Sequence, residues 1–171
     1  MKRIIFCALT VFLSGLAHAQ IDNSDIDLAQ SIFGKSKRLI VSEYIQPDAK
    51  ESDAFWKMYD QYEEKRKLIE KERFLLLKEY ADNYETLDAA EANKLVTGFM
   101  KSTGEYNKLY KTYFKKAERI AGALKAATFI QLEIFIQTSV QSDLQSQIPV
   151  IGELEKLNNK KAEEKTGFLN D

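Results

Sequence analysis

Residues 55–80 read FWKMYDQYEEKRKLIEKERFLLLKEY, and this stretch decides the fold. Apolar and aromatic side chains recur there in steps of four and three, which is the period of one face of a long α-helix. The face comprises Phe55, Tyr59, Tyr62, Arg66, Ile69, Arg73, Leu76 and Tyr80. We predict a helix from Asp48, where Glu51 completes a capping-box pattern, to about Asn83. Such a helix spans about 50 Å, which is too long for a compact globule, so other helices must pack along it.

The same period returns in residues 95–120, LVTGFMKSTGEYNKLYKTYFKKAERI, after a short turn predicted at residues 83–88. Thr86 or Asp88 can cap this second long helix. Its face comprises Leu95, Phe99, Thr103, Tyr106, Tyr110, Tyr113, Ala117 and Ile120. Because only a few residues connect the two helices, we predict an antiparallel hairpin. Gly98 and Gly104 weaken the second helix and mark either a close approach or a bend.

Two shorter helices are predicted beside the hairpin, over residues 24–44 and 124–144. Pro47 ends the first, and Gly122 separates the last from the hairpin. The predicted fold is therefore all-α, a long antiparallel helical hairpin with an additional helix at each end, forming a single domain over residues 20–150. Residues 151–171 carry few apolar side chains and a run of Lys, Glu and Asn, so we expect a mobile tail there.

Residues 1–19 have the three parts of a secretory signal peptide: a basic start, an apolar stretch over residues 4–17, and the small-x-small sequence Ala17-His18-Ala19. We predict cleavage after Ala19 and a periplasmic or secreted protein. An uncleaved membrane anchor is the alternative, but a membrane-spanning helix needs about 20 apolar residues and this stretch is shorter.

Cleavage would remove Cys7 and His18, the only cysteine and the only histidine of the chain. The usual general base, the usual thiol nucleophile and the commonest transition-metal ligands would then be absent. The remaining 23 basic and 26 acidic residues are nearly balanced, which predicts no basic stripe for nucleic acid. We therefore expect no enzyme activity, no catalytic residues, no cofactor, no metal, no nucleic-acid partner and no membrane contact after cleavage.

The hairpin faces supply the candidate residues for protein contact or for the seam between helices: Trp56, Tyr59, Tyr62, Arg66, Arg73, Tyr106, Tyr110, Tyr113 and Glu133. At helical spacing these aromatic residues favour a core, and a groove for apolar segments of unfolded clients is the alternative. An arginine inside a seam needs an acidic partner, and we predict that Arg73 pairs with Glu133. Another set of acids is expected to form a solvated face with neighbouring lysines: Glu63, Glu64, Glu70 and Glu72.

Four segments carry a resemblance to known proteins: Phe55-Trp56-x-x-Tyr59-x-x-Tyr62, Glu79-Tyr80-Ala81-Asp82-Asn83-Tyr84, Lys125-Ala126-Ala127-x-Phe129-x-Gln131-x-Glu133 and Gln147-Ile148-Pro149. Over residues 36 to 150 the chain resembles a group of exported helical bacterial proteins, which in turn look like the periplasmic Spy/CpxP family. Spy-like proteins carry Leu-Thr-x-x-Gln at helix starts, and residues 20–171 contain no such motif. The resemblance implies long helical hairpins that act as ATP-independent chaperones or as adaptors of envelope-stress signalling.

We therefore expect an exported helical interaction protein, chaperone-like or a stress adaptor, whose partner is another protein or an unfolded client. The alternative is a structural or assembly subunit that buries the same faces in a permanent oligomer, of which a homodimer is the simplest form.

Overall fold

The structure is a computed structural model that describes residues 23–146 and 149–153. The predicted signal peptide, residues 1–19, and most of the predicted tail, residues 154–171, lie outside the described residues. The chain falls into two compact units, Met1–Phe33 and Gly34–Asp171. The arrangement of helices given below concerns the second unit, from Gly34 onward.

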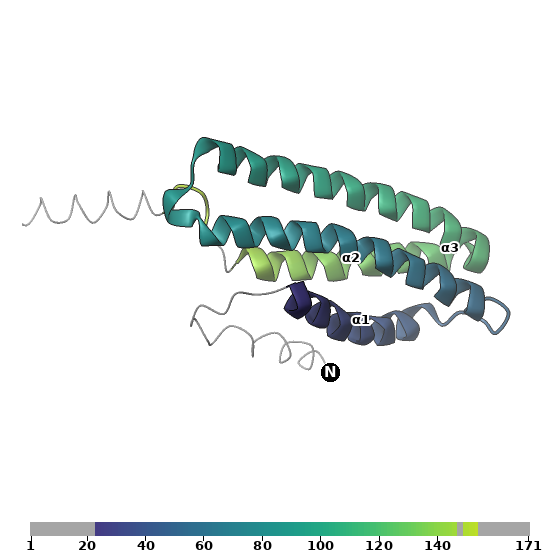
Figure 1. Cartoon of the computed structure of the whole chain (residues 1–171). Coiled ribbons are helices and arrows are strands. Elements are labelled where there is room, and N and C mark those ends of the chain that lie inside the picture. Colours follow the sequence, from purple (N-terminus) through teal and green to yellow (C-terminus); the bar gives the residue numbers. More distant parts are fainter. Residues whose placement is uncertain (1–22, 147–148, 154–171) are drawn as a thin grey trace, which may run out of the picture. The chain divides into compact units, whose positions relative to one another are not determined.

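The described residues are helical and contain no strand, which confirms the prediction of an all-α fold. They form α1 (Asn23–Ile45), α2 (Ser52–Asp82), a short 3₁₀ helix η3 (Tyr84–Thr86) and α3 (Ala89–Gln145), as Figure 1 shows. α2 begins at Ser52 and not at Asp48 as predicted. The Asp48 carbonyl instead accepts hydrogen bonds from the N–H groups of Glu51 and Ser52, 2.9 Å each, which closes a turn before the helix.

A capping box starts α3 at Asp88, one of the two residues predicted to cap it. The Asp88 side chain accepts the Glu91 N–H at 2.8 Å, and the Glu91 side chain accepts the Asp88 N–H at 3.1 Å. Two N–H groups that would lack partners at the helix start are thereby satisfied.

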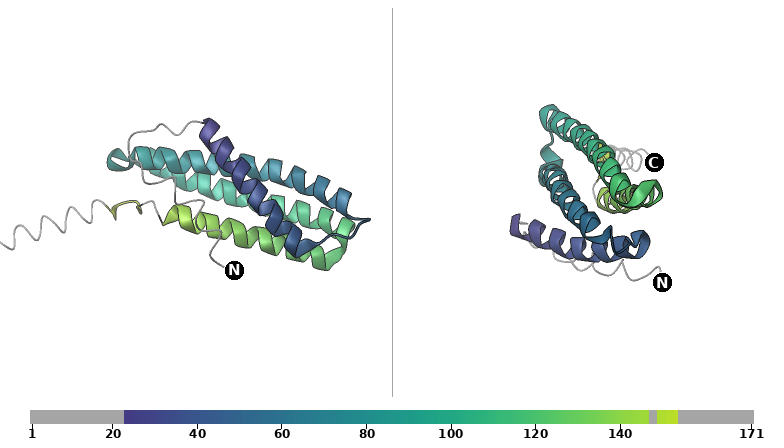
Figure 2. Two further views of the ribbon diagram at one scale, coloured as in Figure 1. Left: turned by 90° about the horizontal axis from the view of Figure 1, so that it is seen from below. Right: turned by 90° about the vertical axis from the view of Figure 1, so that its right-hand side faces the viewer.

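Gly122 interrupts α3, at the residue where the sequence predicts a helix break. Its φ of 79° and ψ of 167° belong to a backbone region that is open essentially to glycine alone. We call residues 89–121 the outgoing half of α3 and residues 123–145 the return half. The outgoing half lies alongside α2, and the return half doubles back (Figures 1 and 2). The return half leads to the end of α2, where the Tyr80 hydroxyl donates to the Pro149 carbonyl at 2.7 Å.

An aromatic core joins α2 to both halves of α3. Phe129 on the return half packs edge-on against Phe55, Tyr59 and Tyr62, with ring centroids 5.8, 6.1 and 5.3 Å away. Tyr62 also meets Tyr113 of the outgoing half at 5.4 Å. All five side chains are at most 1% exposed, so this cluster is closed to solvent. Aromatic pairs of this kind add about 0.5–1.5 kcal/mol each beyond their burial.

Two glycines in the outgoing half have different surroundings. A Cβ atom at Gly98 would overlap the side chain of Leu76 on α2, whereas a Cβ at Gly104 would meet nothing within 4 Å. The predicted close approach is therefore confirmed at Gly98, and Gly104 faces open space.

Candidate functional site

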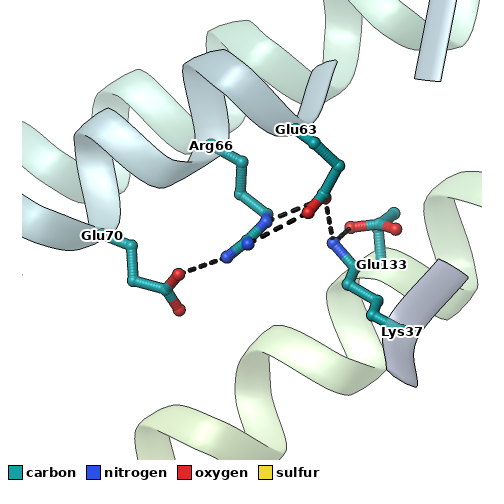
Figure 3. Close-up of polar contacts among 5 residues, drawn as sticks. All are labelled: Lys37, Glu63, Arg66, Glu70 and Glu133. Carbon is teal, nitrogen blue, oxygen red and sulfur yellow. Dashed lines mark hydrogen bonds and ion pairs between the residues drawn. The ribbon is translucent and has the colours of Figure 1, made fainter. Parts of the chain in front are cut away.

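Five charged side chains meet inside the bundle, and we call them the buried charge cluster (Figure 3). Lys37 comes from α1, Glu63, Arg66 and Glu70 come from α2, and Glu133 comes from the return half of α3. The exposed fraction is 2% for Lys37, 1% for Arg66 and 1% for Glu133. Charges are costly to bury without partners. The pairing within this cluster therefore decides whether the folded protein can accommodate these buried charges.

Lys37 bridges two helices that lie far apart in the sequence. Its Nζ lies 2.6 Å from Oε1 of Glu63 on α2 and 2.5 Å from Oε2 of Glu133 on α3. The same ammonium lies 5.2 Å from the centre of the Tyr62 ring, within the range of a cation–π contact. One lysine therefore connects α1, α2 and the return half of α3.

Arg66 is held by acids on its own helix. Its Nε donates to Glu63 Oε1 at 2.9 Å and its Nη2 donates to Glu63 Oε2 at 3.1 Å, a bidentate pair one turn apart. Its Nη1 donates to Glu70 on the following turn. Glu63 thus serves both cations of the cluster, Lys37 from α1 and Arg66 from α2.

The local sequence explains which faces carry these residues. On α1, Lys37 precedes Val41 and Ile45 by four and eight positions, and all three are buried on one side of the helix. On the return half, Glu133 lies between Phe129 and Gln137 at the same spacing, and both neighbours are buried as well.

Burial and pairing act differently on the two innermost carboxyls. Burial alone would raise the pKa of Glu63, but Lys37 and Arg66 outweigh it, so the pKa of Glu63 is lowered. Burial dominates at Glu133 and raises its pKa, with Lys37 opposing the shift and Glu63 adding to it. The Oε1 atom of Glu133 is buried and has no hydrogen-bond partner among the described residues. The cluster holds three carboxyls and two cations, and Glu133 is the carboxyl that most readily keeps a proton.

Four tyrosine hydroxyls are buried in the core near the cluster. The hydroxyl groups of Tyr59, Tyr62, Tyr106 and Tyr113 are buried without a hydrogen-bond partner among the described residues. Burial raises the pKa of each of these four phenols above its ordinary value. Tyr62 lies close to Glu133, which raises its pKa further, although the two groups are not in hydrogen-bonding geometry. These phenols therefore stay neutral.

The predicted contact residues fall into two groups. A buried group lies in the core: Tyr59, Tyr62, Arg66, Tyr106, Tyr113 and Glu133. Trp56 and Tyr110 are half-buried against the core, and Arg73 is half-buried as well. The aromatic side chains of the seam therefore form no open groove in this structure.

The predicted pairing of Arg73 with Glu133 is wrong. Arg73 Nη1 donates to Ser102 Oγ at 3.3 Å, and its guanidinium lies 4.8 Å from the centre of the Phe99 ring. Glu133 pairs with Lys37 instead. The return half places Phe129 against Tyr59 and Tyr62, and Glu133, one turn further along, shares Lys37 with Glu63.

The expected solvated face is wrong for two of its four acids. Glu63 is 8% exposed because it lies on the core side of α2. Among the described residues, Glu70 pairs with the buried Arg66 and not with a surface lysine. Lys37 was not singled out from the sequence at all. Its spacing of four and eight positions before Val41 and Ile45 is the signal that could have found it.

The cluster is suited to fixing helices in register. Among the described residues, no three His, Cys, Asp or Glu side chains are grouped so that they could hold a metal ion. Each carboxyl of the cluster is bonded to a cation that belongs to the same cluster. The arrangement can align α1, α2 and the return half of α3, since a shift of any helix would leave a buried charge unpaired.

Comparisons of the chain with models of protein families, with curated proteins and with solved structures found no match.

Proposed function

We propose that this protein is an exported helical interaction protein that binds apolar segments of other proteins without ATP, as a chaperone or an envelope-stress adaptor. In this proposal the working unit is the long hairpin with a helix at each end, and the contact surface is the outer side of the return half of α3. The large apolar side chains that the return half leaves exposed are the observation that carries the proposal.

The return half buries Ala126 and Phe129 together with two polar side chains, and it leaves three large apolar side chains exposed. Glu133 and Gln137 are 1% and 7% exposed, whereas Leu124, Ile134 and Phe135 are 82%, 45% and 69% exposed. The most apolar eighteen-residue window of α3 has a mean hydropathy of 1.3, high enough by length and composition for a membrane span, yet only 28% of it is buried. A helix of a soluble protein normally buries most of its large apolar side chains, so this one has apolar surface left for a partner.

The outer side of the return half is continuous and uncharged. At helical spacing this side comprises Leu124, Ala127, Gln131, the neighbours Ile134 and Phe135, and Thr138. Exposed apolar residues on α1 and α2, such as Leu39 and Leu68, stand among charged neighbours instead. An uncharged apolar stripe fits an apolar protein segment and offers no salt bridge that would demand one particular sequence.

The closed aromatic core supports placing the contact surface on the return half. Phe55, Tyr59 and Tyr62 are at most 1% exposed, so an arriving client meets none of them while the bundle is closed. Leu124, Ile134 and Phe135 are accessible without any rearrangement of the bundle.

A permanent oligomer is the second candidate, and the spacing of the same stripe favours it. Steps of three and four are those of a coiled-coil seam, into which a helix of a second copy could pack. In that case the stripe would be covered at all times and could not hold a client.

The test compares the double variant Ile134→Ser/Phe135→Ser with the matched control Leu39→Ser/Leu68→Ser. We expect the parent and the control to slow light scattering by a chemically reduced model protein, and the return-half variant to lose most of this effect. Mass in solution is measured for all three proteins. A stable oligomer that becomes monomeric in the return-half variant, without any effect on client aggregation, would establish the assembly subunit and reject the chaperone.

Export is tested separately by cell fractionation and N-terminal sequencing. We expect the protein outside the cytoplasm, with Gln20 as its first residue. A protein recovered from the cytoplasm with residues 1–19 intact would contradict export.

A further inference from the structure

The outward side of the outgoing half of α3 carries a row of basic side chains. Lys108, Lys111, Lys115 and Arg119 follow one another in steps of three and four, so they lie on one side of the helix. All four are exposed. The opposite side of the same segment is buried and comprises Tyr106, Leu109, Tyr113 and Ala117. We call these four cations the basic row.

The basic row is not neutralised by the protein itself. Earlier in α3, Lys94 pairs with Glu79 at 2.6 Å and Lys101 pairs with Glu72 at 3.3 Å. Among the described residues, no acidic side chain pairs with any member of the basic row. Residues 107–121 contain five basic residues and one acidic residue. The nearly balanced charge of the whole chain therefore does not reveal this local excess of basic residues.

We propose that the basic row docks the protein on an anionic phospholipid surface. Lysines near such a surface are attracted by its negative potential, and exposed apolar side chains beside them enter the headgroup region. Met100, 69% exposed, lies on the same half of α3, and Leu124, 82% exposed, follows directly after the turn at Gly122. α3 thus carries exposed apolar side chains as well as the exposed cations of the basic row.

A phosphate surface of nucleic acid fits the row less well. Binding to single strands uses exposed aromatic rings on which bases stack, and Tyr106 and Tyr113 of this segment are 4% and 0% exposed. Three of the four cations are lysines, which contact phosphate as point charges, whereas base readout favours the planar fork of arginine. Exposed leucine and methionine side chains have no role on a nucleic-acid backbone.

Lipid docking goes beyond the proposed function, and of the residues named for it only Leu124 also belongs to the client surface. The client surface proposed above is the uncharged side of the return half, whereas the basic row lies on the outgoing half. The inference also departs from the expectation of no membrane contact after removal of the leader. The physical basis of lipid docking is the charge of the folded surface. The apolar content of the sequence does not reveal that charge.

The experiment measures partitioning of the full chain onto vesicles of phosphatidylglycerol and phosphatidylcholine, and onto vesicles of phosphatidylcholine alone, by co-sedimentation. The variant is Lys108→Gln/Lys111→Gln/Lys115→Gln. The control Lys35→Gln/Lys50→Gln/Lys57→Gln removes the same charge from three exposed lysines elsewhere. The apolar N-terminal residues are common to all three proteins, so only the difference between the two vesicle types is interpreted.

We expect the parent and the control to favour anionic vesicles. Each basic residue near an anionic surface strengthens binding about fivefold (about 1 kcal/mol), so the row variant should lose about 100-fold. Raising the salt concentration to about 1 M should abolish the preference, because charges are then screened within about 3 Å. Equal partitioning onto both vesicle types, or equal losses in variant and control, would overturn the proposal. So would tight binding of a duplex or single-stranded oligonucleotide that the row variant abolishes, in the absence of vesicle binding.

Discussion

Lys37 Nζ lies 2.5 Å from Glu133 Oε2, and these two side chains are only 2% and 1% exposed. The contact joins α1 to the return half of α3 through the interior of the bundle. Glu63 and Arg66 of α2 complete the arrangement, so three helices share one set of buried charges. Such a set specifies register more strongly than it adds stability, because each charge is costly to bury and is offset only by its partners.

Replacing Lys37 by methionine should destabilise the protein strongly. Removing the cation leaves Glu63 and Glu133 buried with one partner fewer, and breaking a buried pair on one side costs about 3–5 kcal/mol. The free energy of unfolding is measured by urea titration, with Lys35→Met, an exposed lysine on the same helix, as the control. We expect the control to change stability by less than about 0.5 kcal/mol. A loss below about 1 kcal/mol at Lys37 would contradict its burial between two carboxylates.

Double-mutant cycles should distinguish the observed pairing from the predicted one. We expect a coupling energy of about 1–3 kcal/mol between Lys37 and Glu133, and a coupling close to zero between Arg73 and Glu133. The substitutions are Lys37→Met, Arg73→Met and Glu133→Gln, alone and in pairs, again measured by urea titration. A larger coupling energy with Glu133 for Arg73 than for Lys37 would contradict the register of the return half of α3 against α1 and α2.

Glu133→Gln should change how stability depends on pH. The pKa of Glu133 is raised above its ordinary value of 4.5, so the folded state keeps a proton that the unfolded chain releases above that pH. Its contribution to stability is therefore complete below about pH 4.5 and is lost as pH rises through the folded pKa, by up to about 1.4 kcal/mol per pH unit. We expect the stability of the parent relative to Glu133→Gln to fall as pH rises above 4.5.

Glu63→Gln should change the pH dependence of stability in the opposite direction, and it serves as the internal comparison. The pKa of Glu63 is lowered, so its contribution is present above the ordinary pKa of 4.5 and is lost as pH falls through the folded pKa. The stability of the parent relative to Glu63→Gln should therefore fall as the solution is acidified below pH 4.5. Parallel pH profiles for the two variants would contradict the different environments of the two carboxyls.

Alanine substitutions at three glycines of α3 should give three different results. Gly104→Ala should stabilise the protein by about 0.5–1 kcal/mol, because alanine favours the helix and nothing obstructs its Cβ. Gly98→Ala should not give this stabilisation, since the new methyl group must displace the Leu76 side chain. Gly122→Ala should cost about 1–2 kcal/mol, because a φ of 79° strains any residue with a Cβ. Thermal unfolding ranks the variants, and equal effects at Gly104 and Gly122 would contradict the sharp turn in α3.

The helices themselves were predictable from the sequence because their signals are local. The alternation of four and three steps in residues 55–80, the cap at Asp88 and the break at Gly122 all act within a few residues, through backbone geometry and nearby hydrogen bonds. The start of α2 was predicted too early because Asp48 has a capping pattern yet lies in a turn.

The burial of individual charges was not predictable in the same way. Glu63 and Glu64 are adjacent acids with the same helix propensity, yet only Glu63 faces the core. Arg66 and Arg73 occupy equivalent positions of the repeat, yet only Arg66 is 1% exposed, between Glu63 and Glu70.

The sequence alone therefore predicted that this chain is helical, where most of its helices begin and end, and which apolar sides of α2 and of the outgoing half of α3 are buried. Only the tertiary structure decided that Lys37 is the partner of Glu133, that the return half of α3 turns apolar residues outward, and that four cations of the outgoing half are left unpaired. The physical reason is the range of the interactions. Helix formation depends on neighbours in the sequence, whereas the pairing of a buried charge depends on the register between helices, which packing of the whole bundle sets.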